Sequence, residues 1–151
     1  METLNTFNTK ELLEALTIIK DLKLGDNSLS ILSHVRFQGI DSKLNIYGTN
    51  LKTNIIATLH NSHFCNFDTC LHFDTLFKAV KSIDTGTCIL TVENGNYTLK
   101  SYDDKEKYKM IHKDGELYPD IPLADGPGAI KIQNSLLQQT LKNCLPSVSD
   151  D

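Results

Sequence analysis

The sequence predicts an α+β domain in which two helices pack on one face of an antiparallel β-sheet. Three observations lead to this class. Residues 8–22 and 73–83 carry apolar side chains at helical spacing. Most of the remaining chain up to residue 112 alternates apolar and polar residues, as half-buried strands do. An Asn94-Gly95 pair between two such runs is typical of a tight hairpin. The predicted order is helix, four strands, helix, three strands.

The first helix is expected to begin at Asn8, which favours the N-cap position, with Glu11 placed three residues later as in a capping box. Its apolar stripe consists of Leu12, Leu13, Leu16, Ile19 and Leu22. Gly25-Asp26-Asn27 is expected to close this helix and to start a turn.

Four strands follow, which we expect within 28–38, 44–48, 52–59 and 67–72. The second helix has Asp74 near its start, and Gly86 follows it. Its apolar stripe consists of Phe73, Leu76, Phe77, Val80 and Ile83. Three further strands are expected at 88–92, 97–101 and 107–112, the last two joined by a charged turn at 103–105.

The last thirty residues repeat the opening of the chain weakly. Residues 118–127 contain three prolines and a glycine, a composition typical of a linker. A short strand at 129–132 is then followed by a helix that Asn134 is expected to cap, with Leu137, Leu141 and Leu145 on it. We therefore expect a domain at 1–120, a linker at 121–127 and the start of a second copy of the same domain at 128–151.

Composition excludes several classes of protein. The chain has 151 residues, of which 40% are hydrophobic and 23% charged, as in ordinary globular proteins. Its net charge of −4 argues against a protein that grips nucleic acid through overall positive charge. The sequence has no apolar run of the ~20 residues that a spanning helix needs, and no signal peptide. We expect a cytoplasmic protein without a membrane partner, whose four cysteines stay reduced.

One segment has residue types that bind zinc. His60, His63, Cys65 and Cys70 lie close together in the sequence, but the two histidines are closer than in a zinc finger and no Cys-x-x-Cys pair accompanies them. A polar hairpin loop is the interpretation we adopt. Nucleophile-elbow, P-loop and dinucleotide-binding patterns are absent from the sequence. We predict no catalytic residue, no metal, no cofactor and no enzymatic activity.

Three short segments, in this order and spacing, resemble one family. Leu29-Ser30-Ile31-Leu32 is similar to a Leu-Pro-Ile-Leu segment, and residues 44–51 are similar to Leu-x-Leu-x-Gly-Thr-Asp-Leu. Tyr118-Pro119-Asp120 is similar to the stretch that precedes the second domain in the same family. The chain thus resembles the N-terminal part of bacterial DNA sliding clamps, the beta subunits of DNA polymerase III.

The resemblance implies a fold and a role. Such clamps are dimeric rings of six similar domains, three per chain, whose helices line the hole and whose sheets face outward. The ring encloses double-stranded DNA, tethers DNA polymerase III, is placed on DNA by a clamp loader, and catalyses nothing. Implied partners are therefore duplex DNA, the polymerase, the loader and another clamp subunit, as a homodimer at full length. The polymerase-binding pocket of the family lies between its second and third domains.

The resemblance also implies two sets of site residues. Candidate DNA contacts are Lys20, Lys23, Lys78, Lys81 and Lys142. The alternative for these lysines is that they only solubilise their helices. Two positions at which the family has arginine are Asp26 and Asp74 here, and its proline is Ser30. Candidate dimer contacts are Thr75, Ala79, Ile83, Tyr108 and Met110, with plain core residues as the alternative.

Two other interpretations of the function are compatible with the sequence. A stand-alone, truncated clamp-like protein could bind or cap another clamp subunit. Six copies of the chain could also close a ring head to tail, although the acidic net charge and the missing arginines argue against this.

Overall fold

The computed structural model describes residues 3–22, 24, 30–40, 42–60, 66–121 and 132–147. The chain divides into two compact units, Met1–Ile121 and Pro122–Asp151, and each is described by itself. Residues 122–127 of the predicted linker at 121–127 and most of the predicted strand at 129–132 lie outside the described residues.

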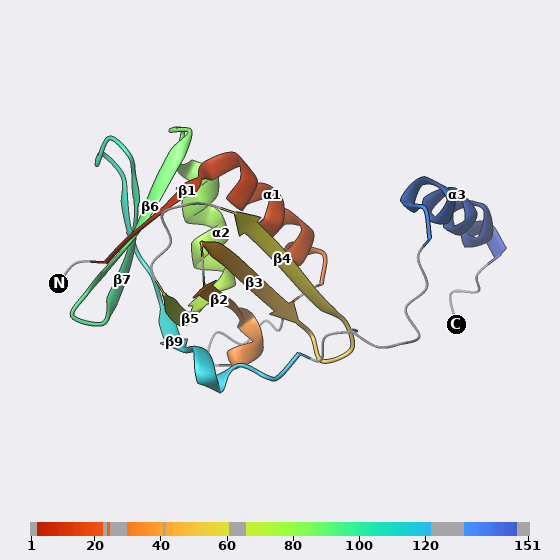
Figure 1. Cartoon of the computed structure of the whole chain (residues 1–151), viewed down its shortest axis with the longest axis horizontal. Coiled ribbons are helices and arrows are strands. Elements are labelled where there is room, and N and C mark those ends of the chain that lie inside the picture. Colours follow the sequence, from red (N-terminus) through yellow and green to blue (C-terminus); the bar gives the residue numbers. More distant parts are fainter. Residues whose placement is uncertain are drawn as a thin grey trace. The chain divides into compact units, whose positions relative to one another are not determined.

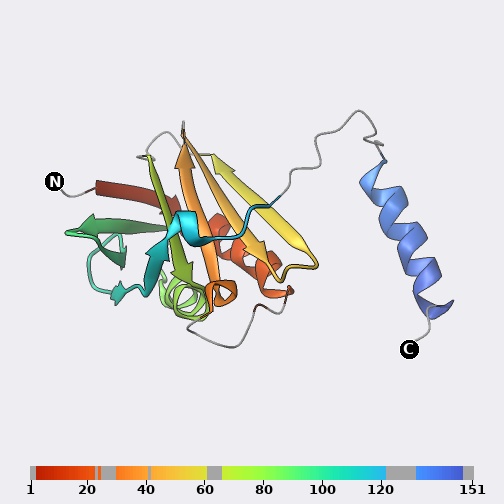
Figure 2. The same ribbon diagram turned by 90° about the horizontal axis from the view of Figure 1, so that it is seen from below.

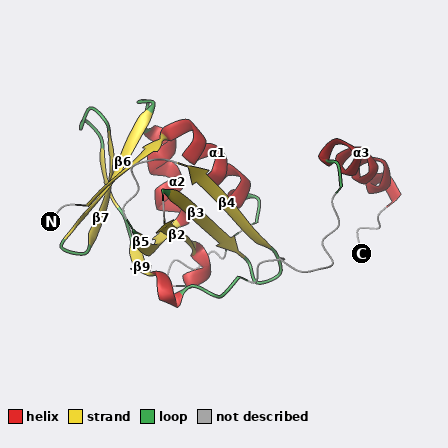
Figure 3. Cartoon of the chain, viewed as in Figure 1, coloured by secondary structure: helices red, strands yellow, loops and turns green. Residues whose placement is uncertain are grey.

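The first unit contains two α-helices, α1 (Thr9–Lys20) and α2 (Phe73–Ser82), and two short 3-10 turns, η1 (Ile31–Ser33) and η2 (Gly115–Leu117). The strands before α2 are β1 (Thr3–Asn8), β2 (His34–Ile40), β3 (Lys43–Thr49), β4 (Asn54–His60) and β5 (Phe67–His72). The strands after it are β6 (Thr87–Glu93), β7 (Asn96–Ser101), β8 (Lys107–Lys109) and β9 (His112–Asp114). Figure 3 shows these helices and strands by type.

The strands form two antiparallel sheets, in the orders β1-β6-β7-β8 and β4-β3-β2-β5-β9. The predicted α+β class is confirmed, but the strands form two sheets where one was predicted, and residues 31–33 of the predicted strand at 28–38 form η1. Two further differences concern β1 and the last predicted strand. Strand β1 was not included in the predicted order, because its inward positions mix the polar Asn5 with Phe7 while its Leu4 is exposed, so it lacks a clear apolar alternation. The predicted strand 107–112 is divided: β8 joins one sheet and β9 the other, because the chain crosses between the sheets at Met110 and Ile111.

The unit is built from two similar halves. The series β1-α1-β2-β3-β4 has the same order of elements as β5-α2-β6-β7-β8. The first strand of each half pairs with the sheet of the other half, β1 with β6 and β5 with β2. As a result β4 and β8 occupy equivalent positions, each at the outer edge of its sheet.

The two helices pack against each other and form one layer, here called the helix layer, in which α1 contacts β1 and β4 of the two sheets and α2 contacts β5 (Figures 1 and 2). Leu12, Leu16 and Ile19 of α1 are buried in the same core as Leu76 and Val80 of α2. These are stripe positions that the helical spacing predicts. Burial of each such side chain stabilises the fold by ~1.5–3 kcal/mol.

Local signals in the sequence are also confirmed. The Oδ1 atom of Asn8 accepts hydrogen bonds from the backbone N–H groups of Lys10 at 3.0 Å and Glu11 at 3.1 Å, which caps α1. Asn94 and Gly95 both have positive φ, 49° and 75°, as a two-residue hairpin turn between β6 and β7 requires.

The Gly48-Thr49-Asn50 segment, part of the clamp-like pattern, lies at the end of β3 and contacts the C-terminal end of α1. A Cβ atom on Gly48 would lie 2.6 Å from Cγ2 of Ile19, so only glycine allows this approach. Asn50 donates from Nδ2 to the carbonyl of Leu22 at 3.0 Å, and its Oδ1 accepts from the N–H of Thr53 at 2.8 Å. The segment therefore fixes helix packing and turn geometry.

The second unit contains the helix α3 (Asn134–Cys144) and the turn η3 (Leu145–Ser147). No residue of α3 is buried. The predicted cap at Asn134 is wrong: Asn134 is the first helical residue, and Gln133 occupies the cap position without a side-chain hydrogen bond. None of the described helices is long and apolar enough to cross a membrane.

Candidate nucleic-acid and subunit interfaces

Three of the five candidate DNA-binding lysines lie on the helix layer. Lys20 is in the last turn of α1, and its Nζ lies 5.1 Å from the centre of the Phe77 ring on α2. This cation–π contact holds the ammonium group across the two helices. Lys78 and Lys81 are exposed on α2. Lys142 is exposed on α3 in the second unit, and Lys23 lies outside the described residues.

The helix layer also carries acidic groups. Glu11 and Glu14 are exposed on α1, and Asp74 is exposed in the first turn of α2. Asp74 lies where a carboxylate interacts favourably with the positive end of the helix dipole. Asp26 lies outside the described residues. The helix layer therefore carries exposed charges of both signs.

A hollow of about 590 Å³, here called the α2 hollow, opens between α2 and β8. Its lining residues are His72, Asp74, Thr75, Lys78, Ala79, Ser82 and Tyr108. The Oγ of Ser82 donates to the Tyr108 hydroxyl at 2.7 Å, which fixes the phenol over the helix. The structure thus brings together three of the candidate interface residues, Thr75, Ala79 and Tyr108.

The other two candidate interface residues lie deeper. Ile83 is 5% exposed and Met110 3% exposed, and both belong to the core. Their burial places them beneath the surface, so the alternative interpretation as core residues applies to them. Helix and strand periodicity gives the correct face for these residues but not their depth.

Strand β8 has an open side. The N–H of Met110 donates to the carbonyl of Tyr97, and the N–H of Ser101 to the carbonyl of Glu106. Hydrogen bonds between antiparallel strands involve every second residue, so residue 108 bonds inward to β7. The backbone groups of Lys107 and Lys109 then point outward, where no described strand pairs with them.

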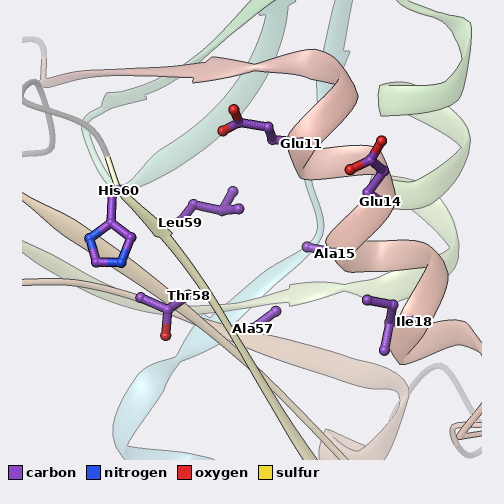
Figure 4. A pocket seen from close by; sticks show the side chains of 8 residues that line it. All are labelled: Glu11, Glu14, Ala15, Ile18, Ala57, Thr58, Leu59 and His60. Atoms are coloured by element: carbon purple, nitrogen blue, oxygen red, sulfur yellow. The ribbon is translucent and has the colours of Figure 1, made fainter. Parts of the chain in front are cut away.

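A second hollow of about 440 Å³, here called the α1 hollow, lies between α1 and β4. Its lining residues are Glu11, Glu14, Ala15, Ile18, Ala57, Thr58, Leu59 and His60. In Figure 4, Leu59 points from β4 toward α1, where Glu11 and Ala15 face it. The sequence analysis did not identify this site. Its signal is Ile18, which lies off the apolar stripe and is 56% exposed.

Strand β4 has an open side as well. The N–H of Asn50 donates to the carbonyl of Thr53, and alternation along the ladder turns residues 55, 57 and 59 inward to β3. The backbone groups of Ile56, Thr58 and His60 therefore point outward, and β4 ends its sheet.

A buried histidine lies beside the α2 hollow. His34 is fully buried, and its Nδ1 lies 3.0 Å from the carbonyl oxygen of Ser30 and 3.1 Å from Oγ of Ser33. Its ring meets that of His72, a lining residue of the hollow, edge to face at 5.3 Å between centroids. Burial lowers the pKa of His34, the hydrogen bond to the Ser30 carbonyl opposes this shift, and the charges of Lys113 and His72 lower the pKa further.

The zinc candidate is only partly described. His60 is exposed at the end of β4, while Cys70 is buried in β5, and burial raises the pKa of its thiol to about 12. His63 and Cys65 lie outside the described residues. Among the described residues, no group of three or more His, Cys, Asp or Glu side chains is placed to hold a metal ion.

Solved structures of sliding clamps share this fold. The Helicobacter pylori beta clamp aligns with 99% of this chain over 40% of its own, at 17% identity and a TM-score of 0.85. The polymerase III beta of Caulobacter crescentus aligns with 100% over 40%, at 18% identity and a TM-score of 0.84. The DNA polymerase III subunit beta of Pseudomonas aeruginosa aligns with 100% over 41%, at 16% identity and a TM-score of 0.79.

The chain spans about two fifths of the length of these three clamps. No protein-family profile and no curated protein sequence matches it. At identities below 20% the structural likeness concerns the fold. The chain thus has the fold of bacterial DNA polymerase III beta sliding clamps, which the short clamp-like segments of its sequence predict.

Proposed function

We propose that this chain is a non-catalytic domain of a DNA sliding clamp, which encircles duplex DNA as part of a ring and tethers a replicative polymerase. The observation that carries the proposal is the clamp fold itself, in which Lys20, Lys78 and Lys81 lie on the helix layer. Its partners in this role are duplex DNA, DNA polymerase III, a clamp loader and a further clamp subunit in a dimer, all in the cytoplasm.

The surface chemistry fits a ring that holds DNA by topology. Lys20, anchored over Phe77, and the exposed Lys78 and Lys81 offer ammonium groups to phosphates without reading bases. The neighbouring carboxylates of Glu14 and Asp74 limit the attraction. Weak, sequence-independent contact lets a closed ring slide, because each lysine exchanges one phosphate for the next at little cost.

The α2 hollow supplies a subunit interface. Thr75, Ala79 and Tyr108 line it, and the adjacent β8 offers outward backbone groups for strand pairing. An exposed strand edge is a template for another chain unless something covers it. The same feature supports a second candidate function, in which the chain caps the edge of a different clamp subunit and thereby blocks ring closure.

Retention on circular DNA tests the proposal. The protein, incubated with a bacterial clamp loader, ATP and nicked plasmid, is expected to co-elute with the DNA in gel filtration. Linearising the plasmid should release it, because a ring slides off an open end. Protein that never co-elutes with the circle, or that remains bound after linearisation, would contradict the proposal. A capping protein would instead reduce the retention of an added intact clamp.

Lysine variants locate the DNA surface. Replacing Lys20, Lys78 and Lys81 with glutamine should weaken binding to duplex DNA in fluorescence anisotropy and lower the salt dependence by about three phosphate contacts. A matched triple variant at Lys43, Lys52 and Lys105, all exposed outside α1 and α2, should bind as the wild type does. Equal losses in both variants would show that only overall charge matters.

A further inference from the structure

His34 lies where three parts of the first unit meet. It begins β2 directly after η1, and it pairs with His72 at the end of β5. Alternation along β2 turns it to the face opposite the core residue Val35, the face that also bears the half-buried Arg36. His34 is nevertheless fully buried. The protein therefore keeps a titratable ring under cover on a face of the sheet that is otherwise partly open to solvent.

The ring of His34 has hydrogen-bond partners on one nitrogen. Its Nδ1 lies 3.0 Å from the carbonyl oxygen of Ser30, which can only accept, and 3.1 Å from Oγ of Ser33. Its Nε2 is buried and has no hydrogen-bond partner among the described residues. The neutral ring can donate from Nδ1 to Ser30, but a protonated ring would carry a second N–H at Nε2. That donor would be buried without an acceptor, which is costly.

The charged groups around His34 do not offset a positive charge. Lys113 and His72 act on it as like charges. The carboxylate of Asp68 is engaged by Arg36, whose Nε donates to it at 2.8 Å. The turn η1 contains no charged residue. By strand register, the titratable side chains on the same face of the sheet are Arg36, Tyr47, Asp68, Cys70, His72 and Lys113. Burial first and these like charges second hold the pKa of His34 below its ordinary value.

His72 connects this place to the start of α2. It occupies the N-cap position of the helix, and its Nδ1 lies 3.0 Å from Oγ1 of Thr75 in the first turn. Its backbone N–H donates to the carbonyl of Ile111 at 2.9 Å, where the chain crosses between the sheets. The centroids of the His34 and His72 rings are 5.3 Å apart. Because His72 and Thr75 line the α2 hollow, displacing His34 removes a support from that lining.

We propose that His34 is a proton-sensitive latch between η1 and the start of α2. When an uncovered His34 takes up a proton, its charge keeps the ring out of the buried position, η1 moves away from the end of β5, and the first turn of α2 loosens. Acid favours this open form, because an exposed imidazole with its ordinary pKa of 6.5 takes up a proton that the covered ring refuses. The latch does not depend on the proposed function; only its effect on a subunit bound at the α2 hollow does.

Hydrogen exchange of backbone amides in the whole chain tests the latch. The reporters are the N–H groups of Ser33 and His72, which donate to backbone carbonyls, and of Phe77, which closes the first turn of α2. From about pH 7 to about pH 5.5, their protection factors, corrected for intrinsic exchange, should fall about threefold or more. At low urea this exchange should hardly depend on urea, which marks a local opening. The full urea dependence of global unfolding at these amides would overturn the latch.

Two matched histidine variants assign the effect. His34→Gln, which stays neutral at both pH values, should abolish the fall in protection at all three amides. His60→Gln, at an exposed position at the end of β4, should retain it. A fall that persists in His34→Gln, or that disappears in His60→Gln as well, would contradict the assignment to His34. A Phe77 amide that does not respond to pH would show that the opening stops short of α2, which the latch does not allow.

A titration of the wild type supplies a test that needs no variant, in case His34→Gln does not fold. NMR of the imidazole nitrogens should show His34 still neutral at about pH 5.5, with its proton on Nδ1. A His34 ring that is protonated there, while the three amides keep their protection, would overturn the latch. These measurements contain no DNA and no further subunit. Failure of the latch therefore leaves retention on circular DNA, and with it the proposed function, to be judged separately.

Discussion

Helices α1 and α3 have similar lengths and similar patterns of leucine, yet they are in opposite environments. Five residues of α1 are buried, against two sheets and α2. No residue of α3 is buried, and Leu136, Leu137 and Leu141 are exposed on it. The pattern alone predicts both helices. What it leaves open is whether a sheet is present to cover the apolar stripe, and most helical stability in proteins comes from that packing.

Thiol reactivity should give the largest difference between the two units. Cys144 is exposed on α3, whereas Cys88 is buried and burial raises the pKa of its thiol to about 11. Alkylation of the native protein, followed by peptide mass spectrometry, should modify Cys144 at least about a thousandfold faster than Cys88, which needs opening of the core. Comparable rates would mean that the core of the first unit opens readily.

Truncating a leucine should have a large effect in α1 and almost none in α3. Leu16 is 0% exposed and Leu137 is 41% exposed. Leu16→Ala should lower the free energy of unfolding by ~2–5 kcal/mol, because it leaves a cavity in the core. Leu137→Ala should change it by less than ~0.5 kcal/mol. Urea denaturation followed by circular dichroism measures both, and equal losses would contradict the described burial.

The helix caps should differ by a smaller amount. Asn8→Ala removes the acceptor for two backbone N–H groups of α1 and should cost ~1 kcal/mol. Gln133→Ala should leave stability unchanged, because Gln133 makes no side-chain cap. Urea denaturation measures the free energy of unfolding of both variants. An Asn8→Ala variant as stable as the wild type would show that the start of α1 is held by other contacts.

The pH dependence should be the smallest effect. His34 has a pKa lowered from its ordinary value of 6.5. As pH falls below 6.5, the unfolded chain takes up a proton that the folded chain refuses, so the free energy of unfolding decreases. His34→Gln should reduce this decrease, whereas His60→Gln, at an exposed position, should retain it. Urea midpoints on both sides of pH 6.5 test the idea, which fails if both variants behave alike.

The sequence predicts those parts of the fold that local chemistry determines. Asn8, the Asn94-Gly95 turn and the stripe through Leu12, Leu16 and Ile19 lie as expected. Two parts could not be predicted. Strand β1 buries Asn5 and exposes Leu4, and the division between β8 and β9 depends on which sheet each joins. Both are decided by long-range pairing.

The candidate site was predicted in part for the same reason. Helical spacing places Lys78 and Lys81 on one exposed face, and strand parity directs Tyr108 toward α2. Spacing does not give depth, so it left Ile83 and Met110 open between a subunit interface and the core, and the structure buries both. The α1 hollow was missed because it joins α1 to β4, segments some forty residues apart.

Photo-cross-linking to duplex DNA tests the central claim most directly, because it reports which layer of the fold faces the DNA. A photoreactive residue at position 81 reports from the helix layer. One at position 45 reports from the opposite face of β3, since Asn45 alternates with the buried Leu44 and Ile46. With the protein loaded on circular DNA, we predict cross-links from position 81 and none from position 45. Cross-links from position 45 alone, or equally from both, would contradict a clamp domain that holds DNA against its helices.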